Sequence, residues 1–179
     1  MKLRVPLIAF SLCTGLCACS NAPAPNAPAP APPVQEPVAK PAPTAEAPPP
    51  ELPVLVDVRA ATHPGFDRLV FEFASDRLPQ WRAERVQIPV TDCGAGQVVP
   101  VSGTAWLQVR FSGAAAHTPE GEATSGPRQR RLRLPVLREL VRTCDFEGEV
   151  TWVAGLAGAH PHRTDVLVSP PRLVVDIAH

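Results

Sequence analysis

Two cysteines, Cys93 and Cys144, are the residues whose type and spacing best predict a defined chemistry in this sequence. The chain has five cysteines, and the other three lie within the first nineteen residues. Neither Cys93 nor Cys144 belongs to a C-x-x-C arrangement of the kind that binds zinc, and no neighbouring histidine is placed to activate a thiol. In an oxidising compartment we therefore predict a single Cys93–Cys144 disulfide. Free buried thiols and a reactive thiol are the alternatives.

Cys19 differs from these two cysteines because it ends a hydrophobic leader. A short basic start precedes an apolar run from Val5 to Ala18, which is too short for a membrane-spanning helix of about 20 residues but has the layout of a secretory signal. The end of the run, Leu16-Cys17-Ala18-Cys19, resembles the bacterial lipobox. This resemblance implies cleavage before Cys19 and attachment of acyl chains such as palmitate to that residue; a plain secretory signal is the alternative. Ser20 is not the aspartate typical of inner-membrane retention, so the outer membrane is favoured in a Gram-negative cell.

Histidines and carboxylates offer the remaining candidates for chemistry. His160 and His162 are the only closely spaced histidines, and a metal site needs further ligands, so we predict no metal and no cofactor. Glu120, Glu122 and Glu147 could serve a hydrolase of envelope polymers if two of their carboxyl groups lay about 5–9 Å apart across a cleft. The sequence contains no G-x-S-x-G, H-E-x-x-H or phosphate-binding glycine motif. We favour a protein that is not an enzyme and keep the hydrolase as an alternative.

The composition divides the chain into three parts. Thirteen of the 24 prolines lie between Ser20 and Pro53, and proline fixes φ and removes amide donors, so this stretch predicts an extended, disordered tether. We expect a signal peptide over residues 1–18, a lipidated cysteine with a Pro/Ala-rich linker over 19–51, and one domain over 52–179. That domain has 14 arginines against 14 acidic residues. This balance argues against a partner recognised by bulk charge, such as nucleic acid.

Apolar and polar residues alternate through most of the domain. Period-two runs occupy residues 54–58, 69–73, 86–90, 106–111, 150–154, 166–168 and 173–177, with glycine- or proline-containing turns between several of them. Short strands at this spacing predict an all-β domain built as an antiparallel sandwich or barrel. Residues 136–144 fit both a helical stripe and a strand, and we favour the strand. Residues 113–131 have little periodicity and predict a long surface loop.

Three stretches of the domain together suggest a family. They are Phe66-Asp67-Arg68-Leu69-Val70-Phe71-Glu72-Phe73, the segment from Asp145 to Leu156, and Pro170-Pro171-Arg172-Leu173-Val174-Val175-Asp176-Ile177. They resemble the AMIN-like domain of bacterial envelope lipoproteins, a relative of the AMIN domains of cell-wall amidases and pilus secretins. The resemblance covers residues 54–177 and implies a β-sandwich-like, non-catalytic module. AMIN domains proper help to target enzymes to peptidoglycan or to the division site.

Aromatic and charged side chains on or near these strands form a candidate binding surface. An exposed tryptophan can stack on a sugar ring, and charged residues at strand ends can contact wall glycans or peptides. Packing of the tryptophans in the core, and pairing of the charges with one another, are the alternative interpretations. The candidate residues are Trp81, Trp106, Trp152, Asp67, Arg68 and Arg172.

These observations together predict an envelope lipoprotein. We expect it to be held to the bilayer through Cys19 and to carry a β domain that acts as a binding or scaffolding module. The expected partner is peptidoglycan or a wall-associated protein, and nucleic acid is not expected. The alternatives are a structural accessory subunit of an envelope assembly and, less favoured, the hydrolase described above.

Overall fold

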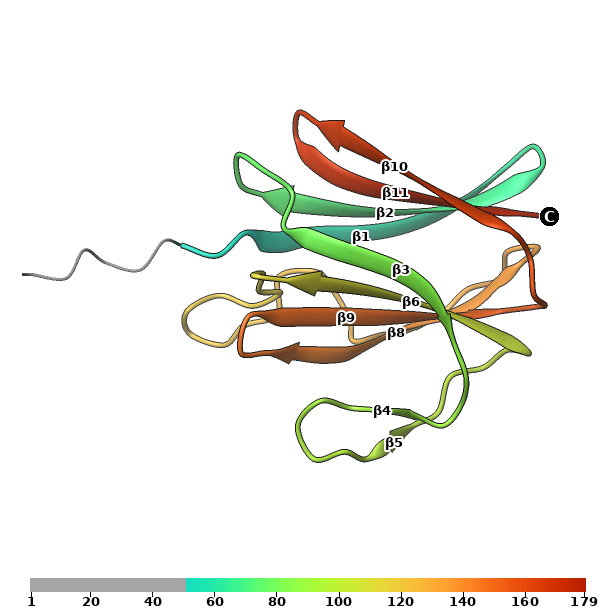
Figure 1. Ribbon diagram of the computed structural model, residues 1–179, viewed down its shortest axis with the longest axis horizontal. Helices are drawn as coiled ribbons and strands as arrows, with labels where there is room; N and C mark the ends of the chain where they lie inside the picture. Colours follow the sequence, from blue (N-terminus) through green and yellow to red (C-terminus); the bar gives the residue numbers. More distant parts are fainter. Residues whose placement is uncertain (1–50) are drawn as a thin grey trace, which may run out of the picture. The chain divides into compact units, whose positions relative to one another are not determined.

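The computed structural model describes residues 51–179, which form two facing antiparallel β-sheets and a small β-hairpin (Figure 1). The signal peptide, Cys19 and the linker lie outside the described residues. The strands are β1 (Val54–His63), β2 (Phe66–Ala74), β3 (Gln80–Val86), β4 (Val90–Thr91), β5 (Val98–Val99), β6 (Ala105–Ser112), β7 (Gln129–Arg131), β8 (Leu137–Phe146), β9 (Glu149–Leu156), β10 (His162–Val168) and β11 (Pro171–Ala178). A four-stranded sheet has the order β1-β2-β11-β10, and a five-stranded sheet has the order β3-β6-β9-β8-β7.

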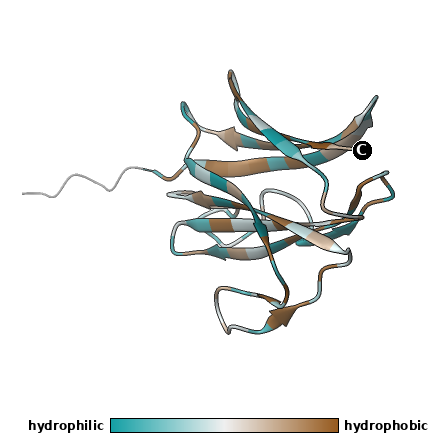
Figure 2. Cartoon of the chain, turned by 45° about the vertical axis from the view of Figure 1, so that its right-hand side comes forward, coloured by the Kyte–Doolittle hydropathy of each residue, from teal (hydrophilic) through white to brown (hydrophobic). Residues whose placement is uncertain are grey.

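The core lies between these two sheets and follows from the alternation in the sequence. Brown and teal segments succeed one another along many of the strands in Figure 2, because successive side chains of a strand point to opposite faces. The inward side chains of β2 and β6 meet at an aromatic cluster, in which the Phe111 ring lies 5.3 Å from Phe71 and 4.9 Å from Phe73. All three rings are buried. The predicted all-β, sandwich-like fold is confirmed.

The strands β2 and β11 pair at the centre of the four-stranded sheet, although about a hundred residues separate them in the chain. Arg68 lies directly opposite Asp176 in this pair. The Arg68 guanidinium donates from Nε and Nη2 to the two carboxylate oxygens of Asp176, at 2.6 and 2.9 Å. Arg163 of β10 donates to the same carboxylate, at 2.9 Å from Nη2. Hydrogen bonding to Arg68 holds the pKa of Asp176 below its usual value, so this carboxylate joins three neighbouring strands as an anion.

Asp67 connects β2 to the beginning of β8 on the facing sheet. Its carboxylate is fully buried, and its Oδ2 accepts hydrogen bonds from the amides of Val136 and Leu137 at 2.7 and 2.9 Å. Its Oδ1 lies 3.1 Å from Nε2 of His179. Burial alone raises the pKa of Asp67, but the hydrogen bonds to its carboxylate, above all those from the amides of Leu137 and Val136, together outweigh this effect and the pKa is lowered. The two sheets are therefore joined by a buried, hydrogen-bonded anion as well as by apolar contact.

The segment from Val90 to Val101, which contains the β4–β5 hairpin and is here called the β4–β5 arm, packs against the outer face of the five-stranded sheet through a second, smaller apolar cluster. Val90 and Val101 from this arm bury Val141 and Val153 of β8 and β9. The chain at Ser102 passes so close to Gly155 that a Cβ atom there would lie 1.9 Å from the Ser102 carbonyl oxygen, which explains the glycine in β9.

Two expectations about local structure need correction. Residues 86–90 are not one strand: β3 ends at Val86 and Val90 begins β4, because Pro89 supplies no amide to a ladder. Residues 113–131 are not simply a surface loop. This segment, here called the covering loop, ends in β7 and contains the buried Ala114, Ala116 and Ser125. The strand favoured for residues 136–144 is confirmed, because β8 covers Leu137–Phe146.

Replacing Asp67 with asparagine should lower the free energy of unfolding at pH 7 by about 1–3 kcal/mol, because the buried amides of Val136 and Leu137 lose an anionic acceptor. The folded-state pKa of Asp67 lies below its usual value of 3.8. The stabilisation is therefore complete above that value and is lost as the pH falls through the lower, folded-state pKa. Urea denaturation at several pH values tests both points. The Asp67→Asn protein should lose less stability than the wild type between pH 5 and pH 3, and equal losses would contradict this role of Asp67.

Candidate functional site

A pocket of about 530 Å³ lies beside the Cys93–Cys144 disulfide, between the β4–β5 arm, the end of β8 and the covering loop. A pocket of this volume falls within the usual range for small-ligand sites. Its wall combines charged and polar groups with the apolar Ala123 and Phe146. The side chains that can recognise a ligand there are His117, Arg128 and Arg142, with Asp92 and Asp145 as the acidic members.

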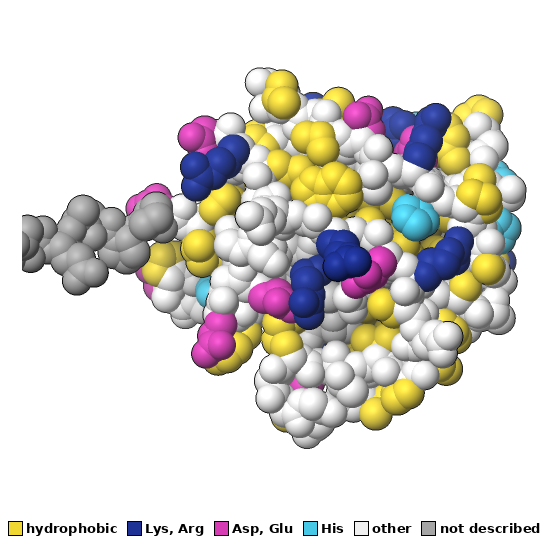
Figure 3. Space-filling model, in the orientation of Figure 1, with side chains coloured by type: hydrophobic (Ala, Val, Ile, Leu, Met, Phe, Trp, Pro, Cys, Tyr) yellow, Lys and Arg dark blue, Asp and Glu magenta, His cyan; other side chains and the backbone are white. Residues whose placement is uncertain are grey.

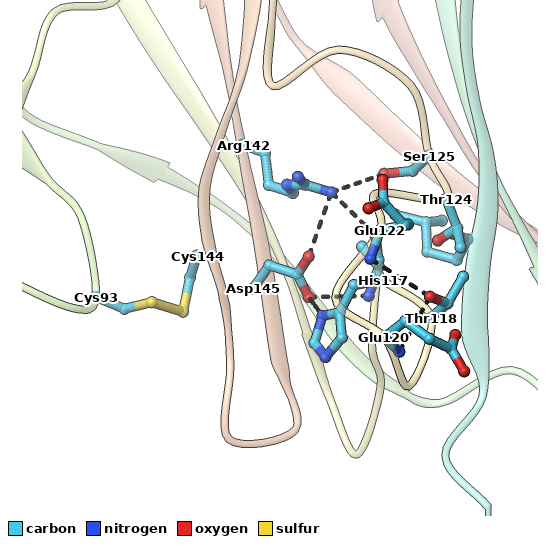
Figure 4. Close-up of polar contacts among 12 residues, drawn as sticks. Cys93, His117, Thr118, Glu120, Glu122, Thr124, Ser125, Arg142, Cys144 and Asp145 are labelled. Carbon is cyan, nitrogen blue, oxygen red and sulfur yellow. Dashed lines mark hydrogen bonds and ion pairs between the residues drawn. A yellow bond between two sulfur atoms is a disulfide. The ribbon is translucent and has the colours of Figure 1, made fainter.

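Asp145, near the end of β8, organises the polar wall of this pocket (Figure 4). Its Oδ1 lies 2.8 Å from Nδ1 of His117 and accepts the amide of Ala116 at 2.9 Å. Its Oδ2 lies 3.3 Å from Nη1 of Arg142. The Asp145 carboxylate thus contacts both the Ala116 amide and the His117 ring of the covering loop, and it holds that loop against β8.

Arg142 completes the network from within β8. Its Nη1 donates to the carbonyl of Ala116 at 3.1 Å and to the Ser125 hydroxyl at 3.2 Å. Its guanidinium carbon lies 5.9 Å from the centre of the Trp152 ring, within cation–π range. The guanidinium is nearly buried, with 12% of its side chain exposed. Arg142 therefore forms a fixed part of the wall, in contrast to the more exposed Arg128 and His117.

His117 and Arg128 present the accessible polar groups of the pocket. Contact with Asp145 through Nδ1 leaves Nε2 of the His117 ring as its other hydrogen-bonding atom, and the side chain is 40% exposed. Arg128 is exposed and uses its Nε to donate to the Arg142 carbonyl at 3.0 Å. This hydrogen bond does not use its two terminal amino groups. This arrangement suits a ligand that offers carboxylate, amide or hydroxyl oxygens.

The predicted disulfide between Cys93 and Cys144 is confirmed. It joins the β4–β5 arm to β8, and the amide of Cys93 also donates to the carbonyl of Thr143 at 3.3 Å. A second hollow of about 300 Å³ lies between the arm and the outer face of the five-stranded sheet, so hollows flank the disulfide on two sides. The disulfide therefore fixes the arm that forms a wall of both hollows.

The six residues of the predicted binding surface do not form one surface. Trp152 and Asp67 are fully buried, so their assignment to an exposed surface is wrong; inward-facing positions in β9 and β2 place them in the core. Trp106 packs in the small cluster under the β4–β5 arm and donates from Nε1 to the Val101 carbonyl at 3.0 Å. Trp81, on the edge strand β3, is 37% exposed and stays available for contact.

The charged candidates are occupied by neighbours within the domain. Arg68 is paired with Asp176, and Nε of Arg172 donates to the Pro170 carbonyl at 3.3 Å. Basic and acidic side chains also lie side by side on the face shown in Figure 3. Surface ion pairs join Arg82 with Glu84 and Arg110 with Glu149. The surface in that view has no large area of a single charge.

The glutamates considered for hydrolysis occupy two exposed turns. Glu120 and Glu122 lie in the covering loop, where their backbone amides approach the Thr118 hydroxyl, and Glu147 lies in the turn between β8 and β9. Within residues 51–179, no three histidine, cysteine, aspartate or glutamate side chains are grouped so that they could hold a metal ion.

The charged or polar pocket residues His117, Arg128, Arg142 and Asp145 are not among the candidate binding residues predicted from the sequence. Arg142 lies in the stretch that fits either a helix or a strand, Asp145 directly follows that stretch, and their partner His117 is nearly thirty residues away. No local motif marks such a contact, since it depends on how the covering loop folds over β8. The sequence pattern also gives no sign that Arg130 of β7 is partly buried. Arg130 is half-buried and donates to the Val58 carbonyl at 2.6 Å, and burial lowers its pKa.

Fold and site together define a small antiparallel β-sandwich domain with a disulfide-bordered polar pocket. The AMIN-like domain family model matches residues 53–179, and the chain belongs to this family. The resemblance seen in the sequence is therefore confirmed. No curated protein and no solved structure matches the chain significantly. Among residues 51–179, there is no helix with the length and apolar character needed to cross a bilayer.

Replacing both Cys93 and Cys144 with serine should destabilise the domain, because the disulfide closes a loop over a sequence separation of 51 residues. The loss of chain-entropy restraint corresponds to about 4 kcal/mol for a loop of this length. Differential scanning calorimetry with and without reductant measures the effect: the wild type should melt lower in reductant, and the double variant should not respond to it. Equal melting temperatures for the oxidised and reduced wild type would contradict a stabilising disulfide.

Proposed function

We propose that this protein is an envelope lipoprotein whose AMIN-like domain is a non-catalytic binding module for peptidoglycan or for a wall-associated protein. The observation that carries the proposal is the polar pocket beside the disulfide, in which His117 and Arg128 present hydrogen-bonding groups. Family membership supports it, because AMIN domains are generally non-catalytic modules of envelope proteins. The pocket is open to solvent, as required for a ligand that belongs to a larger polymer.

The peptide and sugar groups of peptidoglycan match the chemistry of this pocket. They offer carboxylate, amide and hydroxyl oxygens, which guanidinium and imidazole groups can bind through charge-assisted or neutral hydrogen bonds. Arg142 and Asp145 then act as positioning residues, because they fix the covering loop that carries His117. We assign ligand contact to His117 and Arg128.

The N-terminal parts of the chain complete the proposal. Residues 1–18 act as a signal peptide, Cys19 carries the lipid, and residues 19–51 form a linker to the domain at 52–179. A Pro/Ala-rich linker of this length reaches at most about 100 Å when extended, at about 3.1 Å per residue. Such a reach would let the domain contact the wall while the lipid stays in the outer membrane.

Replacing His117 or Arg128 with alanine should weaken binding of soluble peptidoglycan fragments about tenfold, since each change removes a hydrogen bond that involves a charged or strongly polar group. Isothermal titration with the domain tests this, and Trp81→Ala and Arg172→Ala are matched surface controls outside the pocket. Unchanged affinity in both pocket variants would exclude the pocket. Loss of affinity in Trp81→Ala instead would place the contact on the edge strand β3.

Replacing Cys19 with serine should abolish incorporation of labelled palmitate into the full-length protein and move it from the membrane fraction to the soluble fraction. Cys17→Ser is the control, because this residue would leave with the signal peptide. Palmitate labelling that survives Cys19→Ser would contradict the assigned lipidation site.

A further inference from the structure

The strand β10 forms an exposed edge of the four-stranded sheet. It pairs with β11 on one side, and all but the first of its seven residues are exposed. Val166, Leu167 and Val168 are 41%, 38% and 78% exposed, which is unusual for three successive apolar residues. At the opposite edge of the sheet, the start of β1 is paired instead: the amide of Leu55 donates to the Ala115 carbonyl of the covering loop at 2.8 Å. An edge strand of this kind can pair with another chain.

The hydrogen bonds identify which backbone groups of β10 point outward. The Pro161 carbonyl accepts the amide of Ala178, so residues 161, 163, 165 and 167 direct their backbone groups to β11. Residues 162, 164, 166 and 168 then direct theirs to the free edge. In agreement, the Val166 amide donates to the side chain of its neighbour Asp165 at 2.9 Å. The free edge thus carries a regular row of donors and acceptors, one of which is covered by an exposed acidic side chain.

The charges of β10 favour one register for pairing with a second copy of the same strand. Arg163 and Asp165 lie on the same, outer face of the sheet, on either side of Thr164. An antiparallel pair with its two-fold axis at Thr164 sets Arg163 of each copy opposite Asp165 of the other. A shift of the axis to Asp165 would set the two Asp165 carboxylates opposite each other, which is unfavourable.

The same register also gives partners to the exposed apolar side chains and to the outward backbone groups of β10. It sets Val166 opposite His162 of the second copy and Leu167 opposite Pro161, so the exposed apolar side chains gain contacts. It also directs the outward backbone groups of residues 162, 164 and 166 at one another. Every contact occurs twice, as a two-fold interface requires.

We propose that the domain forms a two-fold dimer through antiparallel pairing of β10 with β10 of a second copy, centred on Thr164. Pairing joins the two four-stranded sheets into one continuous eight-stranded sheet. The Asp165 carboxylate releases the Val166 amide, which enters the new ladder, and pairs with Arg163 of the second copy. Arg163 can serve both partners, because it binds Asp176 through Nε and Nη2 and keeps Nη1 available.

Sedimentation velocity of residues 51–179, without ligand, tests the dimer. These residues contain both apolar clusters in full and form one compact unit, so the experiment needs no other part of the chain. The wild type should show a concentration-dependent shift from monomer to dimer. A wild type that stays monomeric at all concentrations overturns the proposal, and this result would leave ligand binding in the pocket unaffected.

Two single variants separate edge pairing from other modes of association. Thr164→Pro removes an amide from the free edge and leaves the β10–β11 ladder intact, so it should give a folded monomer. Asp165→Lys should raise the dissociation constant of the dimer about tenfold or more, because two attractive pairs become repulsive. Asp57→Lys is the matched control, a charge reversal on the same sheet away from β10, and should dimerise like the wild type. If both β10 variants dimerise like the wild type, the proposal is wrong.

A mixing experiment tests the register itself. Arg163→Glu should also be monomeric alone, since the introduced carboxylate would lie opposite Asp165 of the second copy. An equimolar mixture of Arg163→Glu and Asp165→Lys should form a heterodimer. The two introduced charges then lie opposite each other, and the native Asp165 of one copy lies opposite the native Arg163 of the other, so both pairs are attractive. Circular dichroism confirms that each variant is folded. Two folded variants that remain monomeric when mixed would overturn the Thr164-centred register.

Discussion

Asp67 and Arg68, adjacent residues of β2, hold together segments that lie far apart in the chain. The Arg68 guanidinium binds Asp176 across the β2–β11 pair, and the buried Asp67 carboxylate accepts the first amides at the start of β8. Successive side chains of a strand point to opposite faces, so one residue ties its own sheet together and the next reaches the facing sheet. Two of the three sequence stretches that indicate the family therefore meet as the neighbouring strands β2 and β11, with their charges paired at the centre of the sheet.

Two further segments, the β4–β5 arm and the covering loop, are attached to this sandwich by a few side-chain contacts each. The β4–β5 arm lies on the outer face of the five-stranded sheet, held by the small apolar cluster and by the Cys93–Cys144 disulfide. The covering loop is held at β8 by Asp145 and Arg142. The covering loop also adds Ala114 and Ala116 to the main core. The pocket lies between the two segments, where His117 is presented on a rigid support.

The proposed function depends on which charged residues are bonded within the domain and which are accessible to a ligand. The charged residues of the predicted binding surface are engaged inside the domain: Arg68 with Asp176, Asp67 with backbone amides, and Arg172 with the Pro170 carbonyl. Among the charged and polar side chains that stay accessible, His117 and Arg128 lie at the pocket. A domain with balanced charge and a polar pocket beside its disulfide suits selective binding of a small, hydrogen-bonding part of a polymer. This is the basis on which a wall-binding module is proposed.

The period-two pattern determined the all-β architecture, and the two distant cysteines determined the disulfide, because these features depend on local alternation and on the chemistry of the thiol. The pattern also placed Leu107, Val109 and Phe111 on the buried face of β6. It did not place Trp152 or Asp67, because a tryptophan or an aspartate in a strand gives the same pattern whether it faces the core or solvent. The contact of His117 with Asp145 was decided only by the tertiary structure, in which a loop folds back over a strand and brings together residues that share no motif.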